Sequence, residues 1–224
     1  MKAIPASDSS LLVVFGDVIT PEISSCVLAC FHALQGLGDT RIRNLHPGYA
    51  SLLVDFDPLV ASHDEIMRVL ESTANQSGDR QIGDLVEVPV CYGGDFGPDL
   101  DDVSMHTGFS ADAVIGLHAG AIYEVCFLGF TGGFAYLGGL PAELQTPRLA
   151  TPRRAVAAGS VGIAGGQTGI YPAETPGGWR LIGRTPVRMF DPLEDQPTRV
   201  MPGDRVRFVP IDGDEFERLR QERR

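Results

Sequence analysis

The sequence is poor in lysine, cysteine and tryptophan, and it contains no long hydrophobic run. Its 224 residues include one lysine and one tryptophan, so arginine supplies nearly all of the basic side chains. The four cysteines form no Cys-x-x-Cys pair and are too few for a disulfide framework, which fits a reducing compartment. No apolar run approaches the length of a transmembrane helix, and the first residues lack the pattern of a secretion signal. We therefore expect a soluble, cytoplasmic protein.

The spacing of the histidines offers no metal site. None of the five lies in an HxH or HxxxH pattern, the spacings that place two imidazoles on one metal ion. Asp99, Asp101 and Asp102 form an acidic cluster, for which a solvated loop is the usual interpretation and a metal-carboxylate role is the alternative. We expect no metal ion bound by this chain alone.

The charge of the chain is negative overall but unevenly distributed. The formal net charge of −11 argues against nucleic-acid binding as the main function. Residues 1–128 carry 5 basic and 18 acidic side chains, whereas residues 129–224 carry 13 and 11. Between residues 148 and 188, six arginines accompany a single acid, Glu174. This part of the chain is therefore predicted to present a basic patch that attracts a small anion.

Glycine is concentrated in the same part of the chain. The stretch from Gly129 to Asp191 holds 13 of the 27 glycines, the only tryptophan, Trp179, and six arginines. Glycine is retained where a turn needs a positive φ, or where backbone must approach a ligand or another segment closely. The stretch therefore indicates either an anion-binding surface built from tight turns, or a β-barrel whose glycines only turn corners.

The first part of the chain predicts an α+β domain over residues 1–92. Thr20 and Pro21 suit the N-cap and first position of a helix that ends at Gly36 and Gly38. A second helix is expected to begin at Ser62 or His63. The expected strands are 11–15, 42–45, 51–56 and 85–91. The order strand-helix-strand-strand-helix-strand is the ferredoxin-like βαββαβ pattern.

Glycines at positions 93 and 94 mark a boundary, after which residues 93–224 predict a second domain. A helix is expected to begin at Ser110 and to end at Gly120. The short strands expected beyond it are 123–130, 156–164, 179–182, 187–190 and 205–209, and the chain ends in a short solvated helix. Such closely spaced strands favour a β-barrel over a parallel sheet.

Several long motifs in a fixed order resemble one known family. They are GFTGGFAYLGGLP, TPRLATPR, AGSVGIAGGQTGIYP and TPGGWRLIGRTPVRMFDP, preceded by HPGYASLLVDFDP and VPVCYGGDFGPDLDDV. The chain is similar to the family named allophanate hydrolase subunit 1, or Kip-type sporulation-kinase inhibitor, which includes the B subunit of the ATP-dependent 5-oxoprolinase. The resemblance covers most of the chain. It implies that the second domain is a cyclophilin-like β-barrel.

The resemblance also implies a function. A subunit of an ATP-dependent 5-oxoprolinase takes part in opening 5-oxoproline to glutamate with ATP hydrolysis, and it is active only with its partner subunits. Those partners are a second barrel subunit of homologous name and a third, lactam-utilisation subunit, with which ATP is shared. Other members imply two alternatives, namely an inhibitor of a sensor histidine kinase or a component of urea or allophanate metabolism.

The motifs of this family place most of the candidate site residues in the glycine-rich stretch. The substrate- or nucleotide-binding candidates are Tyr136, Arg148, Gln167, Thr168, Tyr171, Trp179 and Arg184, and Arg153 is a catalytic candidate. Residues 164–169 can either wrap a phosphate with backbone N–H groups or form a tight hairpin. Trp179 can either expose its indole for stacking or plug one end of the barrel. Gly132 and Ala157 stand where the family usually has proline, which loosens two turns.

His118 is the second catalytic candidate, as an acid or base. It lies near the end of the helix that begins at Ser110. The negative end of the helix dipole is expected to raise its pKa and to favour a charged imidazole near neutral pH. A structural cap of the same helix is the alternative interpretation.

Overall fold

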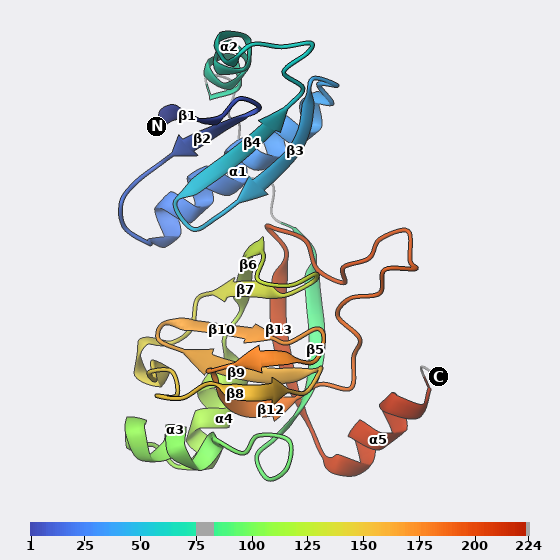
Figure 1. The fold of residues 1–224 in the computed structure, drawn as a ribbon. Helices are drawn as coiled ribbons and strands as arrows, with labels where there is room; N and C mark the ends of the chain where they lie inside the picture. The colour runs from blue at the N-terminus through green and yellow to red at the C-terminus, as the bar shows by residue number, and fades with distance from the viewer. Residues whose placement is uncertain (75–82, 223–224) are drawn as a thin grey trace. The chain divides into compact units, whose positions relative to one another are not determined.

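The computed structural model describes residues 1–74 and 83–222 of the chain. Contacts within the chain divide it into two compact units, Met1–Ile82 and Gly83–Arg224 (Figure 1). In these described ranges, no helix is both long enough and apolar enough to cross a lipid bilayer. The arginine- and glycine-rich stretch lies entirely in the second unit.

The first unit is a four-stranded antiparallel sheet with two helices packed against it. The strand order is β1-β2-β4-β3, with β1 at Lys2–Ser7, β2 at Ser10–Val14, β4 at Ser51–Phe56 and β3 at Ile42–Pro47. The helices are α1, Pro21–Leu37, and α2, His63–Ala74. Alternate residues of β4, namely Leu52, Val54 and Phe56, are buried in one cluster with apolar side chains of both helices. The period of two expected for a half-buried strand therefore sets which face of the sheet is covered.

Helix α1 begins and ends with the residues that the sequence predicts. The hydroxyl of Thr20 accepts a hydrogen bond from the N–H of Ile23 at 3.3 Å, and Pro21 occupies the first turn. Gly38 has a φ of 58°, the left-handed conformation that commonly ends a helix. Local capping chemistry therefore marks both ends of this helix.

The sheet of the first unit is completed by a different strand from the one predicted. β1 pairs with β2 at the sheet edge, where Pro5 is tolerated and where most side chains are exposed. The predicted closing strand, 85–91, belongs instead to β5, Leu85–Tyr92, in the second unit. The structure therefore does not show the ferredoxin-like strand order. The chain passes from the first unit to the second between residues 82 and 83, whereas the predicted boundary lies between residues 92 and 93.

The second unit is built around a closed β-barrel, as the sequence predicts. Its strand order is β10-β7-β6-β13-β5-β12-β9. The bounds are β6 at Tyr123–Leu128, β7 at Ala135–Gly138, β9 at Ser160–Ala164, β10 at Gln167–Ile170, β12 at Arg180–Arg184 and β13 at Arg205–Ile211. A separate ribbon pairs β8, Arg153–Val156, with β11, Thr175–Gly177. The barrel fits the cyclophilin-like architecture that the family resemblance implies.

The helices of the second unit lie outside the barrel. They are α3 at Leu100–Thr107, α4 at Ala111–Gly120, α5 at Gly213–Gln221 and the short 3-10 helix η1 at Ala142–Leu144. α3 and α4 pack against each other, with α3 also against β12 and α4 against β13 (Figure 1). The hydroxyl of Ser110 caps α4 by accepting a hydrogen bond from the N–H of Ala113 at 3.2 Å. The predicted start of this helix is thus confirmed.

Two of the predicted barrel strands differ in detail. The stretch 156–164 is interrupted by a turn in which Gly159 has a φ of 83°, so that β8 ends and β9 begins within it. The stretch 187–190 forms a single bridge, between Phe190 and Thr198, instead of a strand. In both places a turn replaces extended backbone that the apolar pattern alone predicts.

Leu137 on β7 offers a test of barrel packing. Its side chain is fully buried, so Leu137→Ala is expected to lower the free energy of unfolding by about 2–5 kcal/mol, through lost burial and the cavity left behind. Leu193 is 93% exposed, and Leu193→Ala is expected to change this free energy by less than about 0.5 kcal/mol. Urea denaturation followed by circular dichroism measures both. Equal effects of the two substitutions would contradict the placement of Leu137 in the core.

Candidate functional site

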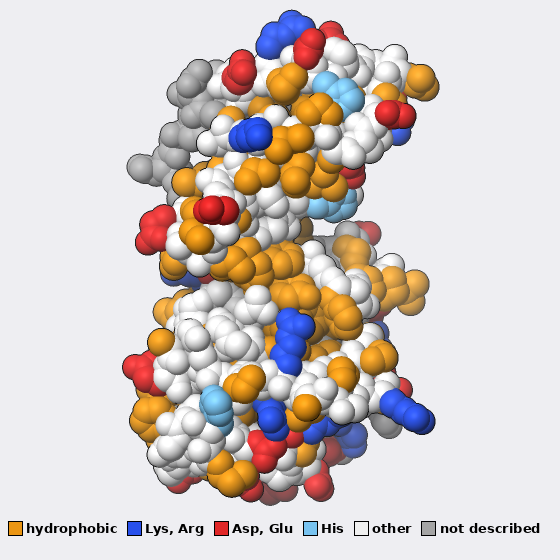
Figure 2. All heavy atoms as spheres, turned by 60° about the vertical axis from the view of Figure 1, so that its left-hand side comes forward, with side chains coloured by type: hydrophobic (Ala, Val, Ile, Leu, Met, Phe, Trp, Pro, Cys, Tyr) orange, Lys and Arg blue, Asp and Glu red, His pale blue; other side chains and the backbone are white. Residues whose placement is uncertain are grey.

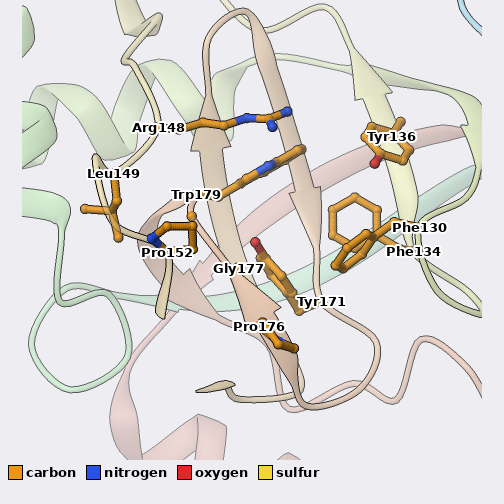
Figure 3. A pocket seen from close by; sticks show the side chains of 11 residues that line it. Phe130, Phe134, Tyr136, Arg148, Leu149, Pro152, Tyr171, Pro176, Gly177 and Trp179 are labelled. Atoms are coloured by element: carbon orange, nitrogen blue, oxygen red, sulfur yellow. The ribbon is translucent and has the colours of Figure 1, made fainter. Parts of the chain in front are cut away.

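A pocket of about 280 Å³ opens on the second unit, lined by several aromatic rings and one arginine (Figure 3). Its lining residues are Phe130, Phe134, Tyr136, Arg148, Leu149, Pro152, Tyr171, Pro176, Gly177, Gly178 and Trp179. Most of them lie in or next to three strands of the barrel, β7, β10 and β12, and strand β11 of the separate ribbon. Figure 2 shows hydrophobic and basic side chains exposed next to one another on one face of this unit. The pocket therefore combines apolar walls with positive charge.

The walls of the pocket are formed by aromatic rings that contact one another edge to face. Phe134 lies with its ring centre 5.3 Å from the ring centres of both Tyr171 and Trp179, at interplanar angles of 82° and 90°. Tyr136 packs against Trp179 at 6.1 Å and 68°. Such contacts are favourable because the positive edge of one ring meets the negative face of the next. Phe134, Tyr171 and Trp179 are buried, so these walls are firmly packed.

Two glycines are required for this packing. A Cβ atom at Gly169 would lie 2.9 Å from the carbonyl oxygen of Ala135 and 3.1 Å from Cζ3 of Trp179. A Cβ atom at Gly177 would clash with the hydroxyl of Tyr171. At these positions glycine permits close approach of backbone to ring, instead of only turning a corner.

Arg148 extends over the pocket from the loop between η1 and β8. Figure 3 shows its side chain and the indole of Trp179 pointing the same way into the pocket. Arg148 is exposed and forms no hydrogen bond or ion pair within the described part of the chain. Its guanidinium group is therefore available to a ligand.

The loop that carries Arg148 is held by its neighbours. The N–H of Leu149 donates to the carbonyl oxygen of Gly178 at 2.7 Å. Nε of Arg180 donates to the carbonyl oxygen of Pro147 at 3.4 Å, while its Nη1 forms an ion pair with Asp102. The backbone on either side of Arg148 is thus fixed before any ligand binds, which reduces the entropy lost on binding.

A second ion pair lies next to the first. Nη2 of Arg153 lies 2.6 Å from Oδ1 of Asp99, and Oδ2 of Asp99 accepts a hydrogen bond from the N–H of Leu181 at 2.7 Å. The Asp99 side chain is 6% exposed and that of Arg153 is 29% exposed. The pair ties β8 to α3 and β12. This role is not apparent in the sequence, because the acids and their arginines are far apart in the chain.

Tyr171 directs its hydroxyl into the pocket (Figure 3). Burial raises the pKa of Tyr171, while a backbone hydrogen bond from Trp179 and the charges of Arg148 and Arg153 act in the opposite direction. The hydroxyl is therefore protonated at neutral pH and can donate a hydrogen bond.

His118 lies inside the barrel instead of in the pocket. It is fully buried and stacks on Phe208, with ring centres 4.6 Å apart. Its Nε2 lies 3.0 Å from the hydroxyl of Thr168, which itself donates to the carbonyl oxygen of Gly162. The Thr168 oxygen must then accept from Nε2–H, so Nδ1 accepts from the hydroxyl of Tyr92 at 2.8 Å. The neutral tautomer of His118 that carries its proton on Nε2 can make both of its hydrogen bonds at once.

The expectation of a charged His118 is wrong. Burial lowers the pKa of His118 to about 3, which outweighs the effect of the helix dipole. The imidazole is therefore neutral at physiological pH. Its position and its partners are those of a structural residue that joins α4 to the barrel.

Residues 164–169 form a hairpin between β9 and β10. Gly165 has a φ of 57°, and its N–H donates to the carbonyl oxygen of Thr146 at 2.8 Å. Gln167 pairs with Ala164 across the two strands. Since the backbone here is engaged in the barrel, the hairpin interpretation is favoured over a phosphate-binding loop, and these residues do not fit the phosphates of ATP.

With this geometry established, comparison with known proteins identifies the family. Residues 1–200 match the family described as carboxyltransferase domain, subdomain C and D. The chain belongs to this family. This membership confirms the resemblance that the sequence motifs indicate.

Two relatives and one solved structure illustrate what this chain is similar to. The 5-oxoprolinase B subunit of Bacillus subtilis (strain 168) is 37% identical over 227 residues, which cover 96% of this chain and 95% of that protein. The 5-oxoprolinase B subunit of Escherichia coli O157:H7 is 58% identical over 126 residues, 56% of this chain and 58% of that protein. The crystal structure of TTHA0988 has a TM-score of 0.81 at 36% identity and covers 91% of this chain, which spans 40% of TTHA0988.

In this carboxyltransferase-family chain, the pocket brings together four of the predicted binding residues. They are Tyr136, Arg148, Tyr171 and Trp179. The predicted residues that do not line it are His118, Arg153, Gln167, Thr168 and Arg184. Arg184 instead donates from Nε to the carbonyl oxygen of Ala158 at 2.9 Å. Phe130 and Phe134 were not predicted, although both lie in the GFTGGF motif that carries the resemblance.

The acidic cluster has a structural role in the same region. Asp99 pairs with Arg153, and Asp102 pairs with Arg180. Across residues 1–74 and 83–222, no group of three His, Cys, Asp or Glu side chains is placed to hold a metal ion.

The buried His118 predicts a pH dependence of stability. Its pKa is about 3 in the folded chain, against an ordinary value of 6.5, so the unfolded chain binds this proton more tightly. Stability is therefore expected to fall as the pH falls from about 6.5 towards 3, by up to about 1.4 kcal/mol per pH unit from this group. Urea denaturation at pH 7, 6 and 5 should show that the free energy of unfolding changes less steeply with pH in His118→Gln than in the unchanged chain. His106→Gln, at an exposed histidine, is the control variant. If the pH dependence of stability in His118→Gln equalled that of the unchanged chain, His118 would not be the buried neutral histidine described above.

Asp99 is expected to be needed for the stability of this region. Asp99→Ala leaves the N–H of Leu181 and the guanidinium of Arg153 without this partner. We expect the free energy of unfolding to fall by roughly 3 kcal/mol, the lower end of the range for breaking a buried ion pair, because water can still reach part of Arg153. Asp101 is exposed in the same helical turn, and Asp101→Ala is expected to cost less than about 1 kcal/mol. Thermal unfolding measures both. Similar melting temperatures for the two variants would argue against a buried ion pair at Asp99.

Proposed function

We propose that this chain is a subunit of an ATP-dependent 5-oxoprolinase that opens 5-oxoproline to glutamate with ATP hydrolysis. The observation that carries this proposal is its relationship to the 5-oxoprolinase protein of Bacillus subtilis, which extends over nearly the whole of both chains. Because the alignment includes both units of the fold, the proposal concerns the whole chain and not one of its domains alone.

The geometry supports handling of a small anionic substrate. The pocket places one available guanidinium group beside aromatic walls, and the hydroxyl of Tyr171 supplies a hydrogen-bond donor. In the reaction, ATP would transfer its γ-phosphoryl group to the lactam oxygen, with release of ADP, which activates the ring carbon for attack by water. The ring carbon–nitrogen bond then breaks to give the free amine, and phosphate leaves as the new carboxylate of glutamate forms. This chain's own residues bind and orient the lactam, while groups for proton transfer are proposed to come from elsewhere in the complex, because His118 is sealed inside the barrel.

We propose that the chain works only in a complex. Its relatives in Bacillus subtilis and Escherichia coli are named as one subunit of an enzyme, which is consistent with partner subunits. The partners proposed are a second barrel subunit of the homologous family and a third, lactam-utilisation subunit. ATP is proposed to be shared with these partners, since the hairpin at residues 164–169 is engaged in the barrel.

The proposal predicts ADP release that requires every component. Purified chain, alone and mixed with its two candidate partner subunits, is assayed for ADP with and without 5-oxoproline. We expect negligible release by the single chain and lactam-dependent release by the complete mixture. Substantial 5-oxoproline turnover by the single chain would overturn the requirement for partners.

Assembly provides the control for this assay. Size-exclusion chromatography with light scattering shows whether the three components associate. An assembled complex whose ADP release does not depend on 5-oxoproline would overturn the proposed reaction, and dependence on urea instead would redirect it to urea or allophanate metabolism.

A further inference from the structure

We infer that the pocket of the second unit is the carboxylate-binding site for the cyclic substrate, with the carboxylate on Arg148 and the ring against Trp179 and Phe134. This inference rests on the proposed function and assigns one part of the substrate to one site on this chain. It also assigns ATP to a different place in the complex.

The charge of the pocket suits one carboxylate. Among the residues that line it, Arg148 is the sole charged side chain. A guanidinium group presents two parallel N–H donors that match the two oxygens of a carboxylate. A triphosphate carries several negative charges and ordinarily requires a metal ion or a row of backbone N–H groups. One arginine on aromatic walls therefore fits a monocarboxylate better than a nucleotide.

Three other arginines of the basic stretch are already engaged. Arg153 pairs with Asp99, Arg180 pairs with Asp102, and Arg184 donates to a backbone carbonyl. Their guanidinium groups stabilise the fold around the pocket. Arg148 differs because its charge is directed over the pocket from a loop that is fixed at Pro147 and Leu149.

The walls suit a small ring. Phe134 and Trp179 are nearly perpendicular to each other, so that together they offer the face of one ring and the edge of another. A volume of about 280 Å³ lies just below the usual range of about 300–1,000 Å³ for small-molecule sites, which suits a small ligand. A five-membered lactam can present its ring methylene groups to these walls while its carboxylate reaches Arg148. The protonated hydroxyl of Tyr171 is directed towards the same space.

Trp179 makes the inference directly measurable. It is the only tryptophan of the chain and it lines the pocket, so its fluorescence reports on binding there. The purified full chain is titrated with 5-oxoproline, with 2-pyrrolidinone, which has the same ring without the carboxylate, and with ATP. We expect a saturable change with 5-oxoproline, and at least tenfold weaker binding of 2-pyrrolidinone.

Two variants distinguish the effect of the arginine in the pocket from the effect of removing any one positive charge. Arg148→Ala is expected to weaken 5-oxoproline binding about tenfold or more, because a charge-assisted pair is lost. Arg154 is exposed on β8 and does not line the pocket, so Arg154→Ala is the matched control and should bind as the unchanged chain does. In the assembled complex, Arg148→Ala should raise the KM for 5-oxoproline by a similar factor and leave the KM for ATP nearly unchanged.

The outcomes distinguish this inference from the proposed function. A complex that turns over 5-oxoproline with the same KM in Arg148→Ala would overturn the inference and leave the function standing. Equal binding of 2-pyrrolidinone and 5-oxoproline, or an ATP response that Arg148→Ala abolishes, would also overturn it. Saturable 5-oxoproline binding that needs Arg148, without lactam-dependent ADP release by the assembled complex, would support the site and overturn the function.

Discussion

Closure of the barrel by β5 is the constraint on which the candidate site depends. β5 pairs in parallel with β13 on one side and with β12 on the other, so the barrel has no free edge. The chain leaves β5 directly towards α3, which packs against β12. This path brings Asp99 and Asp102 to the arginines at the starts of β8 and β12. The position of the acidic cluster is therefore a consequence of strand pairing.

The two carboxylates then determine which arginines remain available. An ionised carboxylate with little solvent exposure requires a partner, and Asp99 finds one in Arg153. Arg180 serves both Asp102 and the backbone at Pro147. The result is a loop held in place on both sides of Arg148, whose own side chain is not used by the fold. The ion pairs of Asp99 and Asp102 thus use Arg153 and Arg180 and leave the guanidinium group of Arg148 available.

Burial also decides the role of His118. In sequence, a histidine near the end of a helix suggests a raised pKa, since the helix dipole favours the charged form. In the fold, the same histidine lies among Tyr92, Thr168 and Phe208, where loss of hydration favours the neutral form. Desolvation of a fully buried group outweighs a dipole effect that is confined to the helix end. A residue that looks catalytic in sequence is therefore a structural one in the fold.

The sequence by itself determined the helix starts at Thr20 and Ser110, the barrel character of the second unit and the family, because capping, turn residues and motif order are local properties of the chain. It also predicted Tyr136, Arg148, Tyr171 and Trp179 as binding residues. Only the tertiary structure decided that β5 joins the barrel, that Asp99 and Asp102 engage two arginines, and that His118 is buried. Each of these depends on segments far apart in the chain, whose proximity and loss of hydration no local pattern encodes.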